Sequence, residues 1–280
     1  MFAIEAVDYT DPDAPQRLTR SLRETGFAVL RNHPIGKERI EAAYRAWGEF
    51  FASPQKDEFR AVPGSQEGFY PFRSENAKGA VQKDLKEFFQ VYPATEMPEG
   101  VSELTRSLYN DLKEMGATVL SWIDENAPPD VRAGFSEPLT GMLENSNECM
   151  LRIIHYPAQD GIEVEPGAER AAAHEDINLI TLLLAGSAPG LQAQDTNGNW
   201  HDVPCDPGMI ALNAGDMLEL ASGGAFPSTT HRVINPERQG AGARFSMPMF
   251  VHPRPEVALS PDKTARAYLM ERLREIGLAS

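Results

Sequence analysis

Short apolar segments rich in β-branched residues follow one another between residues 148 and 251, and they constrain the fold more than any other feature of the chain. Turn-forming residues separate them, and many short strands at this spacing are typical of a sandwich or jelly roll. Asn197-Gly198, between two of the segments, predicts a hairpin with a type I′ turn. The predicted strands are 148–156, 171–174, 178–185, 190–194, 199–203, 209–212, 216–220, 229–234 and 243–251.

The chain before residue 145 has a different pattern, with apolar residues at helical spacing. The predicted helices are 14–25, an apolar face from Ile40 to Phe51, and 98–126, which Gly116 is expected to bend or divide; strands are predicted at 27–30 and 84–92. A last helix is expected to open at Ser260-Pro261 and to stop at Gly277. We therefore expect a mainly β fold with flanking helices.

His174 and Asp176 form the strongest candidate for a metal site. In a strand, side chains two residues apart project from one face, so these two would converge while Glu175 faces away. His231, in a later predicted strand, supplies a third ligand. Two histidines and one carboxylate suit non-haem Fe(II), although the same set also suits Zn²⁺.

The other four histidines have no carboxylate two residues later, and three of them, His33, His155 and His252, are expected to be structural. His201 has Asp202 directly beside it, which places the two on opposite faces of a strand. His33, His155 and His252 stand next to or near proline, with no carboxylate two residues later.

Arg244 and Ser246 share one face of the last predicted strand by the same two-residue period. A guanidinium and a hydroxyl that point together can hold a carboxylate, because arginine offers two parallel donors and serine a third. The alternative is an arginine that pairs with one of the many acidic side chains of the chain.

In this order, H-x-D, a distal H-R-V-x-N-P and R-x-S resemble the Fe(II)/2-oxoglutarate-dependent dioxygenases, in particular the isopenicillin N synthase-like branch. Further segments resemble the family in the same order: G-F-A-V-L-R-N-H-P-I at 26–35, D-L-K-E-F-F at 84–89, G-L-Q-A at 190–193, W-H-D-V-P at 200–204, N-A-G-D-M-L at 213–218 and S-G-G at 222–224. The resemblance covers about residues 22 to 252. One departure is that the N-x-Y of the family is Ile154-His155-Tyr156 here, so only the tyrosine can be carried over.

The resemblance implies one catalytic domain: an N-terminal helical and strand part (1–145), a double-stranded β-helix core (146–252) and a C-terminal helix (253–280). It further implies that His174, Asp176 and His231 bind Fe(II), that Arg244, Ser246 and Tyr156 bind 2-oxoglutarate, and that O2 is the oxidant. The expected reaction is oxidation, by hydroxylation, of a small organic substrate, with decarboxylation of 2-oxoglutarate to succinate. An iron oxidase without 2-oxoglutarate and a non-catalytic jelly-roll metal-binding protein are the alternatives.

Substrate residues are less well defined by the sequence. The segment 61–82 is too long for a simple connection, and long ordered loops are often functional. Its Tyr70, Phe72 and Arg73 are candidates for the substrate cavity, or they cover the core. Arg152 shares a strand face with Tyr156, and it would bind a substrate carboxylate or neutralise a buried acid.

Composition limits the partners and the compartment. The 41 acidic and 26 basic residues give a net charge of −15, which disfavours nucleic acids and anionic membranes. No signal-peptide pattern and no apolar run of about 18 residues is present. With two cysteines, free thiols in a reducing cytosol are expected. We therefore expect a soluble cytoplasmic enzyme that acts on a small molecule.

Overall fold

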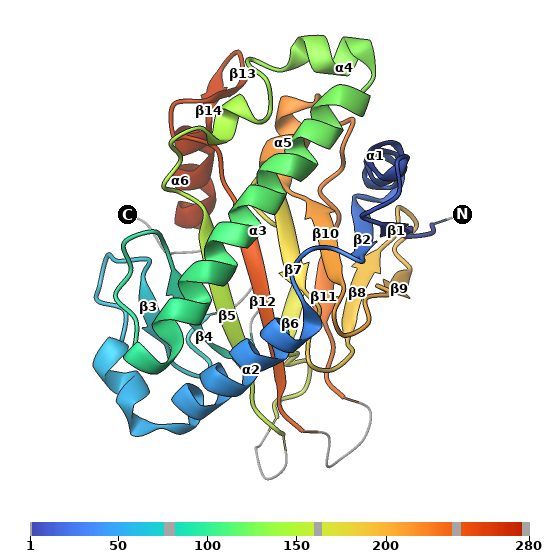
Figure 1. The fold of residues 1–280 in the computed structure, drawn as a ribbon. Coiled ribbons are helices and arrows are strands. Elements are labelled where there is room, and N and C mark those ends of the chain that lie inside the picture. The colour runs from blue at the N-terminus through green and yellow to red at the C-terminus, as the bar shows by residue number, and fades with distance from the viewer. Residues whose placement is uncertain (1, 76–81, 160–163, 237–241, 276–280) are drawn as a thin grey trace.

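The protein is built around two large β-sheets, with helices packed against the larger one (Figure 1), and a third sheet of two short strands lies near the C-terminus. The structure is a computed structural model that describes residues 2–75, 82–159, 164–236 and 242–275. The eight-stranded sheet has the order β1 (Ala6–Asp8), β2 (Phe27–Arg31), β10 (Ile210–Ala214), β7 (Ile180–Leu184), β12 (Arg244–Val251), β5 (Met150–Tyr156), β4 (Glu87–Val91) and β3 (Gly68–Tyr70). The four-stranded sheet has the order β6 (Ala171–His174), β11 (His231–Val233), β8 (Leu191–Gln194) and β9 (Trp200–Asp202).

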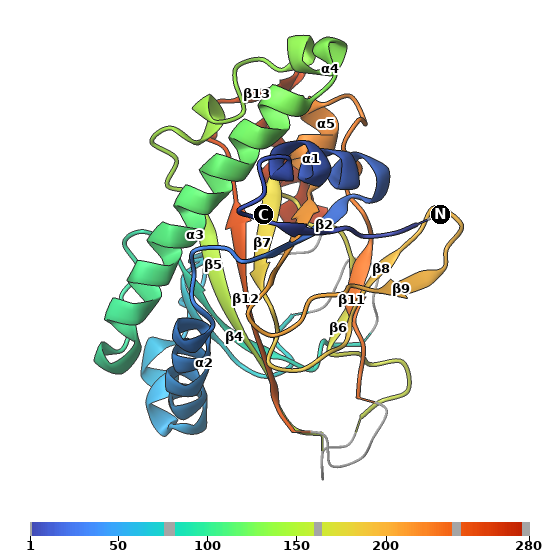
Figure 2. The same ribbon diagram turned by 45° about the vertical axis from the view of Figure 1, so that its right-hand side comes forward.

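The two sheets form separate layers, and the larger sheet lies between the smaller one and the two long helices at 37–52 and 99–126 (Figure 2). This double-stranded β-helix confirms the fold class expected from the sequence. Strands β1 to β4 extend the larger sheet at both edges, so the N-terminal part of the chain belongs to the same fold.

The principal helices are α1 (Ala14–Thr25), α2 (Lys37–Ala52) and α3 (Glu99–Asn126). The predicted apolar face of α2 is confirmed, since Ile40, Ala43, Tyr44, Trp47, Phe50 and Phe51 are all buried. Trp47 also donates a hydrogen bond from Nε1 to Oγ1 of Thr105 on α3, 2.9 Å away. The main hydrophobic core therefore lies between these helices and the larger sheet. Short helices complete the fold: η1 (Pro54–Phe59), α4 (Pro129–Gly134), η2 (Gly141–Leu143) and α5 (Asp216–Ala221).

Gly116 does not divide α3, because the helix runs unbroken through 28 residues. A β-carbon at Gly116 would lie 2.9 Å from Cγ2 of Val251 in β12. The glycine thus allows α3 to approach the sheet closely.

The predicted strand at 216–220 is also wrong, since these residues form α5. Met217, Leu218 and Ala221 are its buried residues, a spacing that fits one helical face. Asp216 in the first turn suits the positive end of the helix dipole.

Three turn predictions need correction. Strands β8 and β9 do form the expected hairpin, but Asn197 has a negative φ and only Gly198 is left-handed, so the turn is not type I′.

Part of the predicted loop 61–82 forms β3, which pairs with β4. Ser260 ends β13 (Ala258–Ser260), which pairs with β14 (Lys263–Thr264), so the last helix, α6, begins later and spans Ala265–Glu275. Its predicted stop, Gly277, lies outside the described residues.

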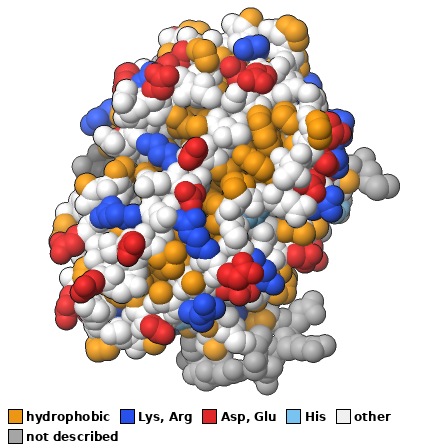
Figure 3. Space-filling view, viewed as in Figure 1, with side chains coloured by type: hydrophobic (Ala, Val, Ile, Leu, Met, Phe, Trp, Pro, Cys, Tyr) orange, Lys and Arg blue, Asp and Glu red, His pale blue; other side chains and the backbone are white. Residues whose placement is uncertain are grey.

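On the face shown in Figure 3, acidic and basic side chains are interspersed with hydrophobic ones. Among the described residues, no helix has the length and apolar character needed to cross a membrane.

Candidate active site

His174, Asp176 and His231 lie together at one end of the smaller sheet. Each offers one ligand atom, and these atoms all lie within 4.8 Å of one another. His174 and His231 are directly opposite on the antiparallel strands β6 and β11. Asp176 Oδ1 lies 3.8 Å from Nε2 of His174 and 3.7 Å from Nε2 of His231. Two ligands that each lie about 2.1 Å from a metal are separated by roughly 3.0 to 3.5 Å, so a small contraction would accommodate an ion.

Both histidines are held in the tautomer that leaves Nε2 available to a metal. Nδ1 of His174 lies 2.8 Å from the carbonyl oxygen of Ala172, and Nδ1 of His231 lies 3.1 Å from that of Thr229. A carbonyl oxygen can only accept, so each Nδ1 carries the proton and each Nε2 presents a lone pair.

Asp176 lies just after β6 and is oriented by its neighbours. Its Oδ2 accepts hydrogen bonds from Oγ1 of Thr181 at 2.6 Å and from Nδ2 of Asn213 at 2.9 Å, which leaves Oδ1 toward the histidines. Burial raises the pKa of Asp176, but the histidines and these two donors outweigh it and hold the pKa below its ordinary value. The carboxylate is therefore ionised, as a metal ligand must be.

Gly215 allows this arrangement. A β-carbon there would lie 2.3 Å from the carbonyl oxygen of Asn178 and 2.8 Å from that of Asp176. Only glycine permits such a close approach. The turn that contains Asp176 can therefore lie against the next residue, Asp216, whose backbone N–H donates to the carbonyl oxygen of Asp176 at 2.8 Å.

Arg244 lies on β12 opposite Tyr156 on β5, and it is 1% exposed. Its Nε donates to the carbonyl oxygen of Ala188 at 2.9 Å, and its guanidinium carbon lies 5.2 Å from the centre of the Tyr156 ring. Nη1 is buried and has no hydrogen-bond partner among the described residues. A β-carbon at Gly186 would lie 2.5 Å from Nη2, so this glycine makes room for the guanidinium.

Ser246 follows on the same face of β12, opposite Ile154. Ser246 and Tyr156 are each 2% exposed. A buried donor without a partner, such as Nη1 of Arg244, is costly, and one carboxylate could pair with the guanidinium and also accept from both hydroxyls. The donor set therefore fits an organic acid.

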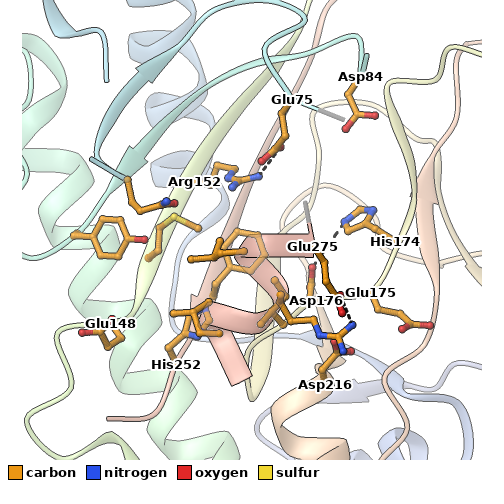
Figure 4. A pocket seen from close by; sticks show the side chains of 18 of the residues that line it. Glu75, Asp84, Glu148, Arg152, His174, Glu175, Asp176, Asp216, His252 and Glu275 are labelled. Carbon is orange, nitrogen blue, oxygen red and sulfur yellow. Dashed lines mark hydrogen bonds and ion pairs between the residues drawn. The ribbon is translucent and has the colours of Figure 1, made fainter. Parts of the chain in front are cut away.

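A cavity of about 640 Å³ reaches His174 and Asp176 and opens between the larger sheet and α6. Arg244, Ser246 and Tyr156 do not line it, so the candidate anion site is separate from this open space. In Figure 4, His174 and Asp176 lie on one side of the cavity, and Glu148 and His252 lie on the other.

An ionic cluster lies on the wall above His174. Nη1 of Arg152 and Nζ of Lys86 lie 3.1 and 2.9 Å from Oε2 of Glu75, and Lys86 also pairs with Asp84 at 2.7 Å. Burial raises the pKa of Glu75, but Arg152 and Lys86 outweigh it and bring that pKa to about 2. Arg152, predicted from the sequence, thus lines the cavity but is already paired with an acid.

Asp84 joins this cluster to the metal site, because its Oδ1 accepts a hydrogen bond from the backbone N–H of Ala172 at 3.0 Å. Ala172 is the residue whose carbonyl orients His174.

The other substrate candidates lie elsewhere. Tyr70 stacks on Phe88 with ring centres 4.7 Å apart, and its hydroxyl donates to the carbonyl oxygen of Ser65 at 3.0 Å. Arg73 lies against the ring of Phe72 and pairs with Glu165 at 3.0 Å. Tyr70, Phe72 and Arg73 are not among the residues that line the cavity.

Sequence reasoning missed several residues of the site. His252 was expected to be structural, but it lines the cavity, as does Phe250. The two-residue period of Arg244 and Ser246 extends to both, which is the signal that could have found them. Asn213 lies in the N-A-G-D segment, but nothing in that segment indicates that it contacts Asp176.

Comparison with known proteins agrees with this geometry. The model of the 2OG-Fe(II) oxygenase superfamily matches residues 147–253, and that of the non-haem dioxygenase in morphine synthesis N-terminal region matches residues 4–111. A candidate oxygenase from Shewanella oneidensis is 47% identical with a TM-score of 0.88 over 98% of each chain. A candidate 2OG-Fe(II) oxygenase family protein from Caulobacter crescentus is 32% identical, with a TM-score of 0.78 over 98% of this chain and 99% of that one. A 2-oxoglutarate-dependent dioxygenase of Monascus ruber is 29% identical over 89% of this chain and 84% of its own length.

The chain belongs to the 2OG-Fe(II) oxygenase superfamily. It is an Fe(II)- and 2-oxoglutarate-dependent oxygenase, so its cofactor is iron and its cosubstrate is 2-oxoglutarate.

Proposed function

We propose that His174, Asp176 and His231 bind Fe(II), and that Arg244, Ser246 and Tyr156 bind the distal carboxylate of 2-oxoglutarate. The observation that carries the proposal is the pairing of three convergent ligand atoms with a buried guanidinium whose Nη1 lacks a partner. A metal-binding module without redox function has no need for the buried guanidinium.

We further propose that a small organic molecule occupies the cavity beside His174 and Asp176 and is hydroxylated there. The volume of about 640 Å³ suits a small ligand. Arg152 on β5, Phe250 on β12 and His252 just after β12 are the candidate contacts, because all three line the cavity.

When bound, Fe(II) and 2-oxoglutarate supply the oxidation of the substrate by O2, with release of CO2 and succinate. The side chains of the protein have the task of holding the reactants in place and limiting access of water. Thr181 and Asn213 fix the carboxylate of Asp176, and the carbonyls of Ala172 and Thr229 fix the two imidazoles. Each of these contacts keeps a ligand atom directed at the same point before the metal arrives.

The finer assignments belong to the same proposal. The isopenicillin N synthase-like branch is supported by the R-x-S segment after the distal histidine. A three-part organisation at 1–145, 146–252 and 253–280 is supported by the two family models, which match separate segments on either side of residue 145. A reducing, cytoplasmic setting is supported by Cys149 and Cys205, which are free thiols.

The test compares Asp176→Ala with His201→Ala, a control in which the imidazole also contacts an aspartate, Asp195, at 2.9 Å. Anaerobic Fe(II) and 2-oxoglutarate should give the visible charge-transfer band of the chelate in the wild type and in His201→Ala. Asp176→Ala should lose the band and all succinate production while it keeps its circular dichroism. Full activity of Asp176→Ala would overturn the assignment of the ligands.

A further inference from the structure

Arg170 is a buried arginine beside the candidate carboxylate site, and it precedes β6 directly. It is 2% exposed. Its Nη2 donates to the carbonyl oxygen of Gly242 at 3.1 Å, and its Nε is buried with no hydrogen-bond partner among the described residues. It forms no ion pair with any acidic side chain that the structure describes.

Two observations connect Arg170 with the surroundings of Arg244. Gly242, which accepts its hydrogen bond, lies two residues before Arg244 in the chain. The next residue, Ala171, packs in one buried cluster with Tyr156, whose ring lies against the Arg244 guanidinium. Burial, and after it the positive charge of Arg244, lowers the pKa of Arg170.

The acidic residues nearest in sequence are already engaged. Glu169 pairs with Arg232 at 3.1 Å, and Glu165 pairs with Arg73 at 3.0 Å. Two buried guanidinium groups in this region therefore each keep an unsatisfied donor, and no carboxylate of the described chain pairs with either of them. Such an arrangement is costly unless an anion binds between the groups.

We propose that Arg170 is a second cosubstrate-binding arginine, which holds the distal carboxylate of 2-oxoglutarate together with Arg244. This inference rests on the proposed function. Ile154, opposite Ser246, stands where the family has the asparagine of N-x-Y, and it offers no donor. Arg170 directly precedes Ala171, which packs in one cluster with Ile154 and Tyr156, so it can supply the donor that Ile154 lacks. Its positive charge favours a dicarboxylate over a 2-oxo acid with an apolar tail.

The test measures binding of 2-oxoglutarate and of 2-oxopentanoate, which has the same chain length but no distal carboxylate. Both are titrated anaerobically into Fe(II)-loaded wild type, Arg170→Gln, Arg170→Lys and Arg254→Gln. Arg254 is the control, because it also donates to a backbone carbonyl, that of Gly141, but lies away from the site and pairs with Glu137. Thermal unfolding of each metal-free protein is recorded as well.

Arg170→Gln should weaken binding of 2-oxoglutarate by about ten- to a hundredfold, the effect of one charge-assisted hydrogen bond, and Arg170→Lys by less. Binding of 2-oxopentanoate to Arg170→Gln should be unchanged. The midpoint of thermal unfolding of this metal-free variant should not fall, because the substitution removes a buried charge that Arg244 repels. Unchanged 2-oxoglutarate affinity, or equal losses for both ligands, would overturn the proposal and make Arg170 a structural residue. If the wild type fails to bind 2-oxoglutarate, the proposed function itself is wrong, and this inference falls with it.

Discussion

Asn213 donates a hydrogen bond from Nδ2 to Oδ2 of Asp176 across 2.9 Å, and thereby fixes which oxygen of the carboxylate faces the two histidines. Both residues are buried, at 4% and 6% exposure. Since β10 carries Asn213 and the turn after β6 carries Asp176, this bond links the two sheets at the metal site.

Asn213→Ala should weaken Fe(II) binding by roughly ten- to a hundredfold, the usual effect of losing a partner that orients a metal ligand. Anaerobic titration with Fe(II) measures the change. Asn199→Ala is the control, because Asn199 also donates to an aspartate, Asp195, but in the exposed β8–β9 hairpin. Equal affinities in Asn213→Ala and Asn199→Ala would mean that Asp176 is positioned without Asn213.

Gly116→Ala should destabilise the protein although alanine is the better helix former. The new methyl group would lie 2.9 Å from Cγ2 of Val251, and overpacking of this kind costs about 1 to 3 kcal/mol. Gly100→Ala, in the first turn of the same helix, meets nothing within 4 Å and should stabilise the protein by less than about 1 kcal/mol. Urea unfolding of the two variants should therefore shift in opposite directions, and a stabilised Gly116→Ala would contradict the packing account.

Features governed by a short repeat could be predicted from the sequence. The buried face of α2 follows the helical period, and Arg152 and Tyr156 follow the strand period. Features set by contacts between distant segments could not be predicted. In the sequence alone, Gly116 suggests a break in the helix, and only the structure shows that it makes room for Val251. The role inferred for Arg170 likewise depends on Arg244, which is distant in the sequence.

The residues 216–220 show how short apolar runs mislead. Met217, Leu218 and Leu220 suit a strand as well as one turn of helix, and tertiary contacts decide between them. Asp176 shows a different limit of sequence-based prediction. Its convergence with His174 was predicted correctly, but the reason given, strand alternation, was wrong. The strand ends at His174, and the turn held by Gly215 places the carboxylate instead.

His252 should make the protein sensitive to acid. Burial lowers the pKa of His252 to about 4 in the folded protein, whereas an unfolded histidine titrates near about 6.5. The unfolded chain therefore takes up the proton first, and this contribution to stability is complete above about pH 6.5 and is lost as the pH falls toward 4. The shift corresponds to at most about 3 kcal/mol.

Replacement by an uncharged residue checks this effect. Metal-free His252→Gln should lose less unfolding free energy than the wild type between pH 7 and pH 4.5, because glutamine does not titrate. Parallel pH profiles for the two proteins would show that His252 is protonated in the folded state as readily as in the unfolded chain.

Arg152 should affect use of the prime substrate, whereas Arg73 should not, since only the former lines the cavity. In a panel of small amino and organic acids scored by succinate production, Arg152→Gln should change the order of preferred substrates. Arg73→Gln should keep the wild-type order. A changed order in Arg73→Gln alone would show that Arg73, and not Arg152, selects the substrate.

The central claim is that Arg244 binds the cosubstrate of an Fe(II) enzyme, and titration of 2-oxoglutarate into anaerobic Fe(II)-loaded protein tests it most directly. The charge-transfer band is followed in wild type, Arg244→Lys and Arg244→Ala. Loss of one charge-assisted bond costs about 1.5 to 3 kcal/mol, so Arg244→Lys should bind 2-oxoglutarate about ten- to a hundredfold more weakly and Arg244→Ala more weakly still. Fe(II) affinity without cosubstrate should stay the same in all three. Equal 2-oxoglutarate affinities in the three proteins would contradict the account.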